Sequence, residues 1–473
     1  MVSCLACALD PLPQRRLVFA PCDALRLLNL SKTPKQLKQL HARILRAGIS
    51  RDPAVLAALL RLYSSHRIDL ASQLFSAYPD PPTIAWNLMI RAHAAAGFPR
   101  DALLLYNRMI ASGVRPDKFT FPFAVKACSS LSEVRKGKEV HAFAIKAGFF
   151  LDLFVQNALI HFYLTCGDLV SGRKVFDGMR AKSVVSWTAL ISGLVACGDM
   201  EAARAVFDAA PVRNVVTWTA MIDGCARNGR PDEAFELFQR MLDGGARPNE
   251  FTAVALLIAC TELGSSSLGR WVHELARKNG GLERSVYVGT ALVDMYSKCG
   301  SLEDAARVFG QMPKRSLATW NSMITSLGVH GHGKEAVALF REMERANVKP
   351  DGITFVGVLS ACAREGMVEE GFRLFAHMAE CHGIAPLFEH YSCLAQLLGC
   401  ADSLIGGVEM IKNMISKFDA RARWMMLKAC RMNGNVRLEE VLGNCIRDLE
   451  LSGGGASLAQ IEYQSIKWEV EHK

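Results

Sequence analysis

The amino-acid sequence predicts an all-α fold in which short helical hairpins are stacked into a solenoid. A tryptophan-centred phrase recurs at intervals of 101, 31 and 102 residues, around Trp86, Trp187, Trp218 and Trp320. Such recurrence is typical of stacked repeats, each of which packs only on its neighbours. Between the phrases, apolar residues follow the spacing of amphipathic helices, and no apolar run is long enough to cross a bilayer. We therefore expect an extended binding surface rather than one catalytic pocket.

The composition excludes a disordered chain, because half of the residues are apolar and 21% are charged. The net charge of +9 is compatible with binding a polyanion along one face. Cys128, Cys260 and Cys362 recur at one place in the repeats, which favours small buried hydrophobes. The CxxC of Cys4 and Cys7 lacks a second ligand pair, so we expect no metal site and no cofactor.

Residues 1–35 are expected to form an N-terminal extension. They contain no repeat phrase, and their arginines lie among leucine, alanine, proline and cysteine, as in an organelle transit peptide. Asp10 and Asp23 depart from the acid-poor composition of such peptides. Targeting and non-targeting roles therefore both stay open.

Residues 83–117 show how each repeat is expected to fold. One stripe of apolar residues at helical spacing begins at Trp86, and a second ends at Met109. Gly97 and Pro99 separate the two helices, and a Ser-Gly pair ends the second. Because such a hairpin cannot bury its apolar face alone, neighbouring hairpins must stack.

The repeat phrases tile residues 36–419 as about eleven units almost without gaps. Most units contain 31, 35 or 36 residues, so the stacking must tolerate different lengths in a set order. After a partial first unit, the units are 53–82, 83–117, 118–152, 153–183, 184–214, 215–249, 250–285, 286–316, 317–351, 352–387 and 388–419.

This tiling resembles the pentatricopeptide repeat family, in particular its plant type with mixed standard, long and short repeats (the PLS type). The motifs that carry the resemblance are VVTWTAMIDGCARNGRPDEAFELFQRMLDGGARPN (215–249), GTALVDMYSKCGSLEDAARVF (289–309) and ITFVGVLSACAREGMVEEG (353–371). Tetratricopeptide repeats fit less well, because they keep a strict period of 34 residues. The resemblance implies a right-handed α-solenoid superhelix.

The C-terminal part departs most from the family. Residues 420–451 look like the first half of an E-type extension, and residues 452–473 are a diverged polar tail. The cytidine deaminase domain of some relatives needs an H-x-E … P-C-x-x-C zinc site. No histidine here is followed two residues later by glutamate, and no CxxC occurs after residue 7. We therefore expect a chain that is not an enzyme.

The resemblance implies that each unit reads one RNA base through its fifth and its last residue. The implied pairs are Asn87/Asp117, Asn157/Ser183, Thr188/Asn214, Thr219/Asn249, Thr290/Ser316 and Asn321/Asp351, with Ser392/Asp419 in the eroded last unit. By the family's code they favour U, C, A, A, a purine, U and G. The long units carry Pro122, Val254 and Val356 at the fifth position and are expected to be spacers.

Two alternatives to base contacts stay open. Asn, Asp and Ser at the end of a unit are also ordinary helix-capping residues, and one side chain can serve both roles. The recurrent tryptophans are candidates for stacking on bases, but their phase beside Ile and Leu favours packing in the core.

The expected partner is single-stranded organellar RNA, bound by a monomer that does not enter a membrane. The leading hypothesis is site recognition for C-to-U editing, with a DYW-type deaminase and editing factors supplied in trans. A role in transcript stabilisation, processing or splicing and a protein-binding scaffold are the alternatives. The resemblance favours the chloroplast over the mitochondrion.

Overall fold

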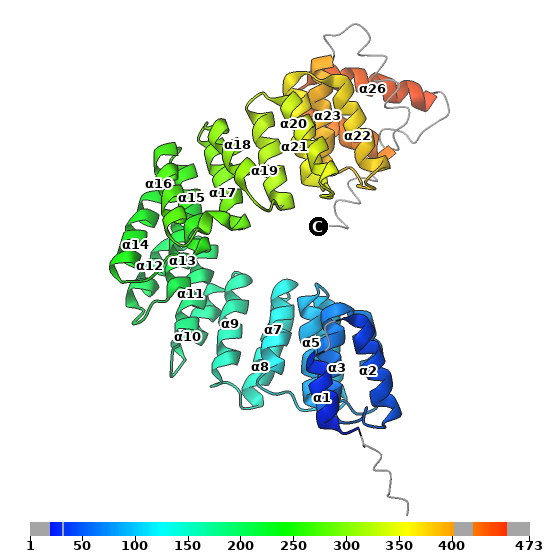
Figure 1. Cartoon of the computed structure of the whole chain (residues 1–473), viewed down its shortest axis with the longest axis vertical. Coiled ribbons are helices and arrows are strands. Elements are labelled where there is room, and N and C mark those ends of the chain that lie inside the picture. Colours follow the sequence, from blue (N-terminus) through cyan, green and yellow to red (C-terminus); the bar gives the residue numbers. More distant parts are fainter. Residues whose placement is uncertain (1–18, 31–32, 402–419, 452–473) are drawn as a thin grey trace, which may run out of the picture. The chain divides into compact units, whose positions relative to one another are not determined.

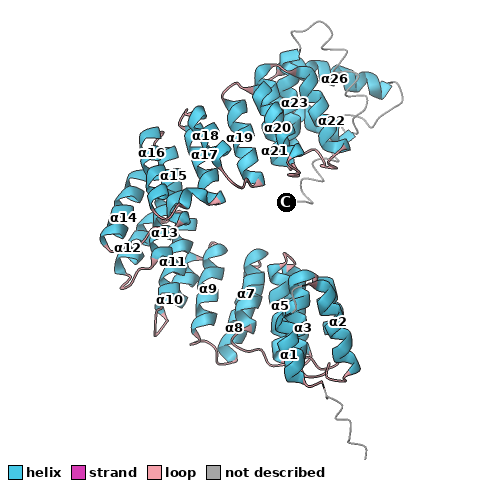
Figure 2. Cartoon of the chain, in the orientation of Figure 1, coloured by secondary structure: helices cyan, strands magenta, loops and turns pink. Residues whose placement is uncertain are grey.

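The computed structural model describes residues 19–30, 33–401 and 420–451, and every element in these ranges is a helix (Figures 1 and 2). The expected all-α fold is confirmed. The chain divides into two compact units, Met1–Met221 and Ile222–Lys473. In the described ranges, no helix is both long and apolar enough to span a membrane.

In the described part of the first unit, the helices follow one another as antiparallel pairs. Successive first helices, such as α5, α7 and α9, also pack on one another. The helices are α1 (Pro21–Leu30), α2 (Pro34–Arg46), α3 (Pro53–His66), α4 (Ile68–Ser76), α5 (Thr83–Ala95), α6 (Pro99–Ala111), α7 (Thr120–Ser130), α8 (Val134–Lys146), α9 (Leu153–Thr165), α10 (Leu169–Asp177), α11 (Val184–Ala196) and α12 (Met200–Ala209), followed by α13 (Val215–Arg227) at the boundary.

The second unit repeats this arrangement, and its first helices α15, α17, α19, α21 and α23 pack in series. Its described elements are α14 (Pro231–Asp243), α15 (Glu250–Glu262), α16 (Ser266–Lys278), the 3-10 helix η1 (Leu282–Arg284), α17 (Val286–Lys298), α18 (Leu302–Gln311), α19 (Leu317–Val329), α20 (Gly333–Arg345), α21 (Gly352–Glu365), α22 (Val368–Glu380), α23 (Phe388–Ala401), α25 (Ala420–Met432) and α26 (Val436–Leu451).

The ordered helices begin inside the segment expected to be an extension. Helix α1 packs on α3 and buries Ala24 and Leu28 completely. The segment expected to be a partial E-type extension forms the hairpin of α25 and α26, and α25 packs on α23. Both ends of the described chain therefore continue the stacked-hairpin arrangement.

The difference between 31- and 35-residue units lies in the second helix. In the 35-residue units this helix has 13 residues, as in α6, α14 and α20. In the 31-residue units it has 9 or 10, as in α10, α12 and α18. Because one α-helical turn takes 3.6 residues, the four missing residues amount to about one turn. The first helix has 13 residues in both kinds of unit, as in α5, α13 and α19 and in α9, α11 and α17, although α7 has 11. The shortening therefore leaves the serial packing of first helices in place.

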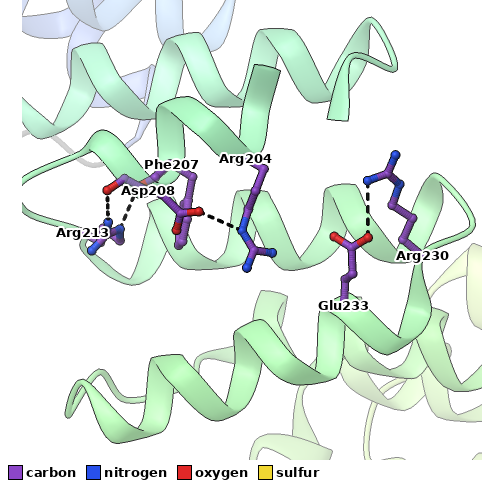
Figure 3. A network of polar contacts seen from close by, with 6 residues as sticks. All are labelled: Arg204, Phe207, Asp208, Arg213, Arg230 and Glu233. Carbon is purple, nitrogen blue, oxygen red and sulfur yellow. Dashed lines mark hydrogen bonds and ion pairs between the residues drawn. The ribbon is translucent and has the colours of Figure 1, made fainter. Parts of the chain in front are cut away.

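In two of the three 31-residue units, an arginine next to the end of the unit closes the shortened helix. Arg213 donates to the carbonyl oxygens of Phe207 and Asp208 at 2.9 and 2.8 Å (Figure 3). Its guanidinium also lies 4.9 Å from the Phe207 ring centre. Arg315 bonds to the Phe309 carbonyl in the same way and lies 4.5 Å from that ring. These contacts satisfy carbonyls that the missing turn leaves open.

The recurrent tryptophans pack between neighbouring units. Each meets, edge to face, a phenylalanine from the second helix of the preceding unit, with ring centres 4.7 to 5.1 Å apart. Trp86, Trp218 and Trp320 are buried, whereas Trp187 is partly exposed. The expectation of core packing is therefore confirmed for three of the four, and Trp187 makes the same ring contact.

Three histidines of second helices bind tyrosine hydroxyls of the following unit. Nδ1 of His41, His141 and His273 lies 2.8 to 3.0 Å from the hydroxyl of Tyr63, Tyr163 and Tyr296, respectively. Burial lowers the pKa of each imidazole. The lowered pKa favours the neutral imidazole at pH 7, and each hydrogen bond joins two adjacent repeats.

The in-phase cysteines are packing residues. Cys128, Cys260 and Cys362 are fully buried, as their recurrence predicts. Burial raises the pKa of each thiol to about 12. Because a thiolate is the reactive form, these thiols are inert at neutral pH.

Candidate nucleic-acid interface

The predicted reading residues occupy two recurring places in the fold. Every fifth residue lies on a first helix, one position after the core residue of the phrase. Five of the described last residues directly precede the next first helix and accept a hydrogen bond from its backbone, as capping residues do. Asp117 is separated from α7 by two residues and accepts from the amide of Thr120, the first residue of that helix. This hydrogen bond fixes the last residue of one unit at the start of the first helix of the next unit.

A third residue, which the sequence analysis missed, stands between the two members of a pair. It is the third residue of the following unit, and after all six pairs it carries a hydroxyl that is fully buried: Thr120, Ser186, Thr217, Thr252, Thr319 and Thr354. After the units with Ala57, Pro122, Val254 and Val356 at the fifth position, the same place holds Ala85, Val155, Val288 and His390. The hydroxyl therefore accompanies a polar fifth residue, and this phase is the signal that could have identified it.

Asn87, Asp117 and Thr120 form one complete polar triad. The Asn87 amide donates to Asp117 Oδ1 at 2.9 Å, and the Thr120 hydroxyl lies 2.7 Å from Asn87 Oδ1. Asp117 Oδ1 also accepts from the Thr120 amide at 3.0 Å. Within the described residues, no hydrogen bond ends at Asp117 Oδ2. One carboxylate oxygen is thus held by the protein, and the other remains for a ligand.

Asn321, Asp351 and Thr354 form the same triad in the second of the two compact units. The corresponding distances are 3.1 Å from the Asn321 amide to Asp351 Oδ1 and 2.6 Å from the Thr354 hydroxyl to Asn321 Oδ1. Burial opposes ionisation of Asp351. The bonds from Thr354 and Asn321 outweigh it and hold the pKa of this carboxyl below its usual range. A stable negative charge therefore lies in this reading pair at neutral pH.

The threonine-type pairs use the same connection through hydroxyl groups. Thr188 Oγ1 lies 2.7 Å from Thr217 Oγ1, which donates to Asn214 Oδ1 at 2.9 Å. Thr290 Oγ1 lies 2.7 Å from Thr319 Oγ1, which in turn contacts Ser316 Oγ at 2.9 Å. Different side chains are therefore held at one fixed place in each unit.

The remaining predicted residues occupy the same two places in their units. Ser183 contacts the hydroxyl of Ser186 at 3.1 Å, while the buried Oδ1 of Asn157 has no hydrogen-bond partner among the described residues. Asn249 caps α15, and Thr219 lies on α13.

The eroded last unit gives a weaker picture. Ser392 contacts Asn433 in the turn after α25, with an oxygen–oxygen distance of 3.4 Å. Its predicted partner Asp419 lies outside the described residues. The structure therefore describes only one member of this pair.

A row of exposed apolar side chains accompanies the reading pairs. The second residue of the repeat unit is aliphatic or aromatic in most units, and in seven of them it is more than half exposed. The row contains Ile84, Phe154, Val185, Val216, Phe251, Tyr287 and Ile353, with Phe119 at 49%. The rings of Phe251 and Tyr287, from consecutive units, are 6.2 Å apart. Exposed apolar surface repeated in phase with a polar site indicates contact with a flat apolar ligand.

A cavity of about 410 Å³ opens beside Asn321. It is lined by residues of α17, α19 and α21, among them Ile353 of the apolar row. Ser297 Oγ and Ser322 Oγ line it and are buried without a hydrogen-bond partner among the described residues. Unpartnered buried polar atoms beside a cavity are consistent with a site that a polar ligand completes.

Basic residues before the proline of the 35-residue units are exposed. Arg115, Arg247 and Lys349 all lie at the surface, as solvated loop charges do.

Two family models match the repeats. The model described as the PPR repeat family matches residues 81–130, 213–262 and 315–364, and the PPR repeat model matches 185–214, 290–317 and 353–382. The chain is 50% identical over 405 residues to the Arabidopsis thaliana pentatricopeptide repeat-containing protein At3g26630, chloroplastic, covering 85% of this chain and 88% of the relative. It is 41% identical to the chloroplastic protein ELI1 of the same plant, covering 91% of this chain and 68% of the relative.

Among solved structures, the chain is similar to the pentatricopeptide repeat protein PPR10 from maize. The sequence identity is 20% and the TM-score is 0.47, with 95% of this chain and 72% of that chain covered.

Proposed function

The chain belongs to the pentatricopeptide repeat family, and on this premise we propose that it binds single-stranded RNA sequence-specifically in a plant organelle. The observation that carries the proposal is the polar triad, repeated in phase with the repeats and present only where the fifth residue is polar. A purely structural cap does not require a polar partner on the preceding helix.

The chemistry of the triads fits the edge of a base. In the Asn87 and Asn321 triads, one amide hydrogen and one carboxylate oxygen remain outside the internal bonds. Uracil offers a carbonyl acceptor next to an N–H donor, which is the complementary pattern. The fixed spacing of the triads then presents one base to each reading unit.

The exposed apolar row supports the same arrangement. A base held at its edge by a triad leaves two flat faces, and aliphatic or aromatic residues at the second position supply surfaces for both. Stacking tolerates any base, so specificity stays with the triads. With spacers at Pro122, Val254 and Val356, the proposed target reads 5′-U-N-C-A-A-N-purine-U-N-G-3′, with the final G assigned from Ser392 and Asp419.

Within this function, we favour site recognition for C-to-U editing, with the deaminase supplied in trans. Two features support the editing role: the PLS-type order of unit lengths, and the resemblance of residues 420–451 to a partial E-type extension. The chloroplast is the proposed compartment, because two similar relatives are named chloroplastic. Transcript stabilisation, processing or splicing is the second candidate, since the same triads would serve any of these roles.

Sequencing of RNA crosslinked to the protein in its own organelle tests the proposal. We expect enrichment of the gapped motif in organellar transcripts, with an edited cytidine close to its 3′ end. Loss of the protein should then lower editing at that cytidine. Unchanged editing together with altered transcript ends or retained introns would favour the second candidate. Absence of any enriched RNA motif would refute RNA recognition and favour a protein-binding scaffold.

A further inference from the structure

Three side chains with metal-binding groups converge in the second of the two compact units, Ile222–Lys473. Glu344 lies in the last turn of α20, His377 in the last turn of α22, and His382 in the turn that follows α22. One ligand atom from each lies within 4.8 Å of the others. In the described part of the chain, this is the one group of three or more such side chains with this proximity.

The two imidazoles direct the same kind of atom to one point. Nε2 of His377 lies 2.8 Å, and Nε2 of His382 2.9 Å, from Oε1 of Glu344. The ring centres are 5.0 Å apart, and the ring planes are nearly perpendicular at 82°. The rings therefore approach the carboxylate from two directions, as ligands around a common centre do.

The surroundings combine a dry wall with access from solvent. The fully buried ring of Phe355 lies 5.6 Å from the His382 ring and 6.5 Å from the His377 ring. The side chains of His377, Glu344 and His382 remain 36%, 28% and 20% exposed. An ion can reach the cluster from one side, while the aromatic wall excludes water from the other.

We propose that Glu344, His377 and His382 bind a divalent transition-metal ion of the zinc class. Two imidazole nitrogens and one carboxylate are a ligand set that zinc takes in proteins, with a fourth position left for water. Tetrahedral ligands at zinc distances lie about 3.3 Å from one another, so the Glu344 carboxylate has to retreat by about 0.5 Å. Hard cations such as Mg²⁺ prefer oxygen ligands and are not expected to bind.

Binding requires that two protons leave the centre of the cluster. Each Nε2 now carries a hydrogen directed at Glu344, and the metal takes the nitrogen lone pair instead. A neutral imidazole moves its proton to Nδ1, whereas a charged one releases a proton to water. Affinity is therefore expected to fall on acidification. The bound ion would fasten the 317–351 unit to the 352–387 unit through their second helices.

Metal binding by the full-length, metal-free protein tests the assignment. Co²⁺ absorption spectra and Zn²⁺ titration calorimetry in excess Mg²⁺ report stoichiometry and ligand type. We expect one equivalent with a nitrogen and oxygen spectrum. His377→Gln and His382→Gln should each abolish binding of this metal ion. The affinity should fall by more than the roughly 10–100-fold that is typical when a residue hydrogen-bonded to a metal ligand is lost. Glutamine keeps an N–H for Glu344, so circular dichroism should show that these variants stay folded.

Two controls separate this site from other binding. His332 forms an exposed pair with Glu335 at 2.7 Å, and His332→Gln should leave the equivalent intact. Cys381 is an exposed free thiol beside His382. It should not be needed for metal binding, so Cys381→Ser should still bind one equivalent of metal. A spectrum dominated by thiolate, loss of the equivalent in Cys381→Ser, or unchanged binding in both His377→Gln and His382→Gln would overturn the proposal.

Discussion

Replacement of Thr354 by valine tests whether the shared hydroxyl positions a reading pair. Valine keeps the shape of threonine but removes a hydroxyl 2.6 Å from Asn321 Oδ1 and 2.9 Å from Asp351 Oδ1. Because the Thr354 side chain is fully buried, water is not expected to replace it without rearrangement. A buried acceptor without its donor costs about 1–3 kcal/mol. The variant is therefore expected to let Asn321 leave its place beside Asp351.

The loss should appear as reduced discrimination at one base. If misplacement removes about 1–3 kcal/mol of base contact, the preference for uracil opposite this unit falls roughly 5- to 150-fold. Kd values for four RNAs that differ only at this base measure the change. Hydrogen exchange at the start of α21 measures local stability, because repeat arrays do not unfold in two states.

The matched control is Thr261→Val. The Thr261 hydroxyl bonds the Leu257 carbonyl inside α15 at 2.9 Å, and its loss should leave all four Kd values unchanged. The reasoning is refuted if Thr354→Val keeps full discrimination, or if it weakens binding to all four RNAs equally.

Three further predictions, one with a matched control, test the packing between and within repeats. A Cβ atom at Gly137 would lie 1.9 Å from the Phe162 ring, so Gly137→Ala should lower the unfolding temperature by overpacking worth about 1–3 kcal/mol. Gly310→Ala, with nothing within 4 Å, should raise it slightly, and equal effects would contradict the packing argument. For His141, burial lowers the folded-state pKa, so stability should fall as pH drops through 6.5 towards that lower value. His141→Gln should reduce this acid sensitivity in urea unfolding at several pH values, and an unchanged pH profile would be the contrary result. Arg315→Met should lower local stability at the end of α18 by about 1–2 kcal/mol, measured by hydrogen exchange, through the lost carbonyl and ring contacts, and a cost near zero would exclude the closing role.

Periodicity sufficed for the helices because most first helices also carry a polar start signal, although α5, α7 and α17 have no side-chain cap. Asp351 and Asn249, for example, were visible as polar residues before an apolar run, and both cap the next helix. The sequence did not indicate which element of a 31-residue unit is shortened by the four missing residues. The position of the shortening depends on contacts of Arg213 and Arg315 with ring faces and carbonyls that no local pattern specifies.

The candidate site was only partly visible in the sequence. Asn321 and Asp351 follow from the family resemblance, but Thr354 belongs to the next unit and is not reached by pairing residues within one unit. The cluster of Glu344 and His377 was missed for a different reason. These residues are 33 positions apart, a separation typical of no metal-binding motif, and only the stacking of second helices brings them together.

The hydroxyl contributed by the following repeat has a consequence for how such a protein can change its target. Transplanting residues 317–351 into another array would carry Asn321 and Asp351 but leave Thr354 behind. A block shifted by three residues, 320–354, would carry all three together. The segment that carries one complete triad is thus offset by three residues from the helical hairpin. Chimeras cut at the hairpin boundary therefore combine the fifth and last residues of one protein with the hydroxyl residue of another.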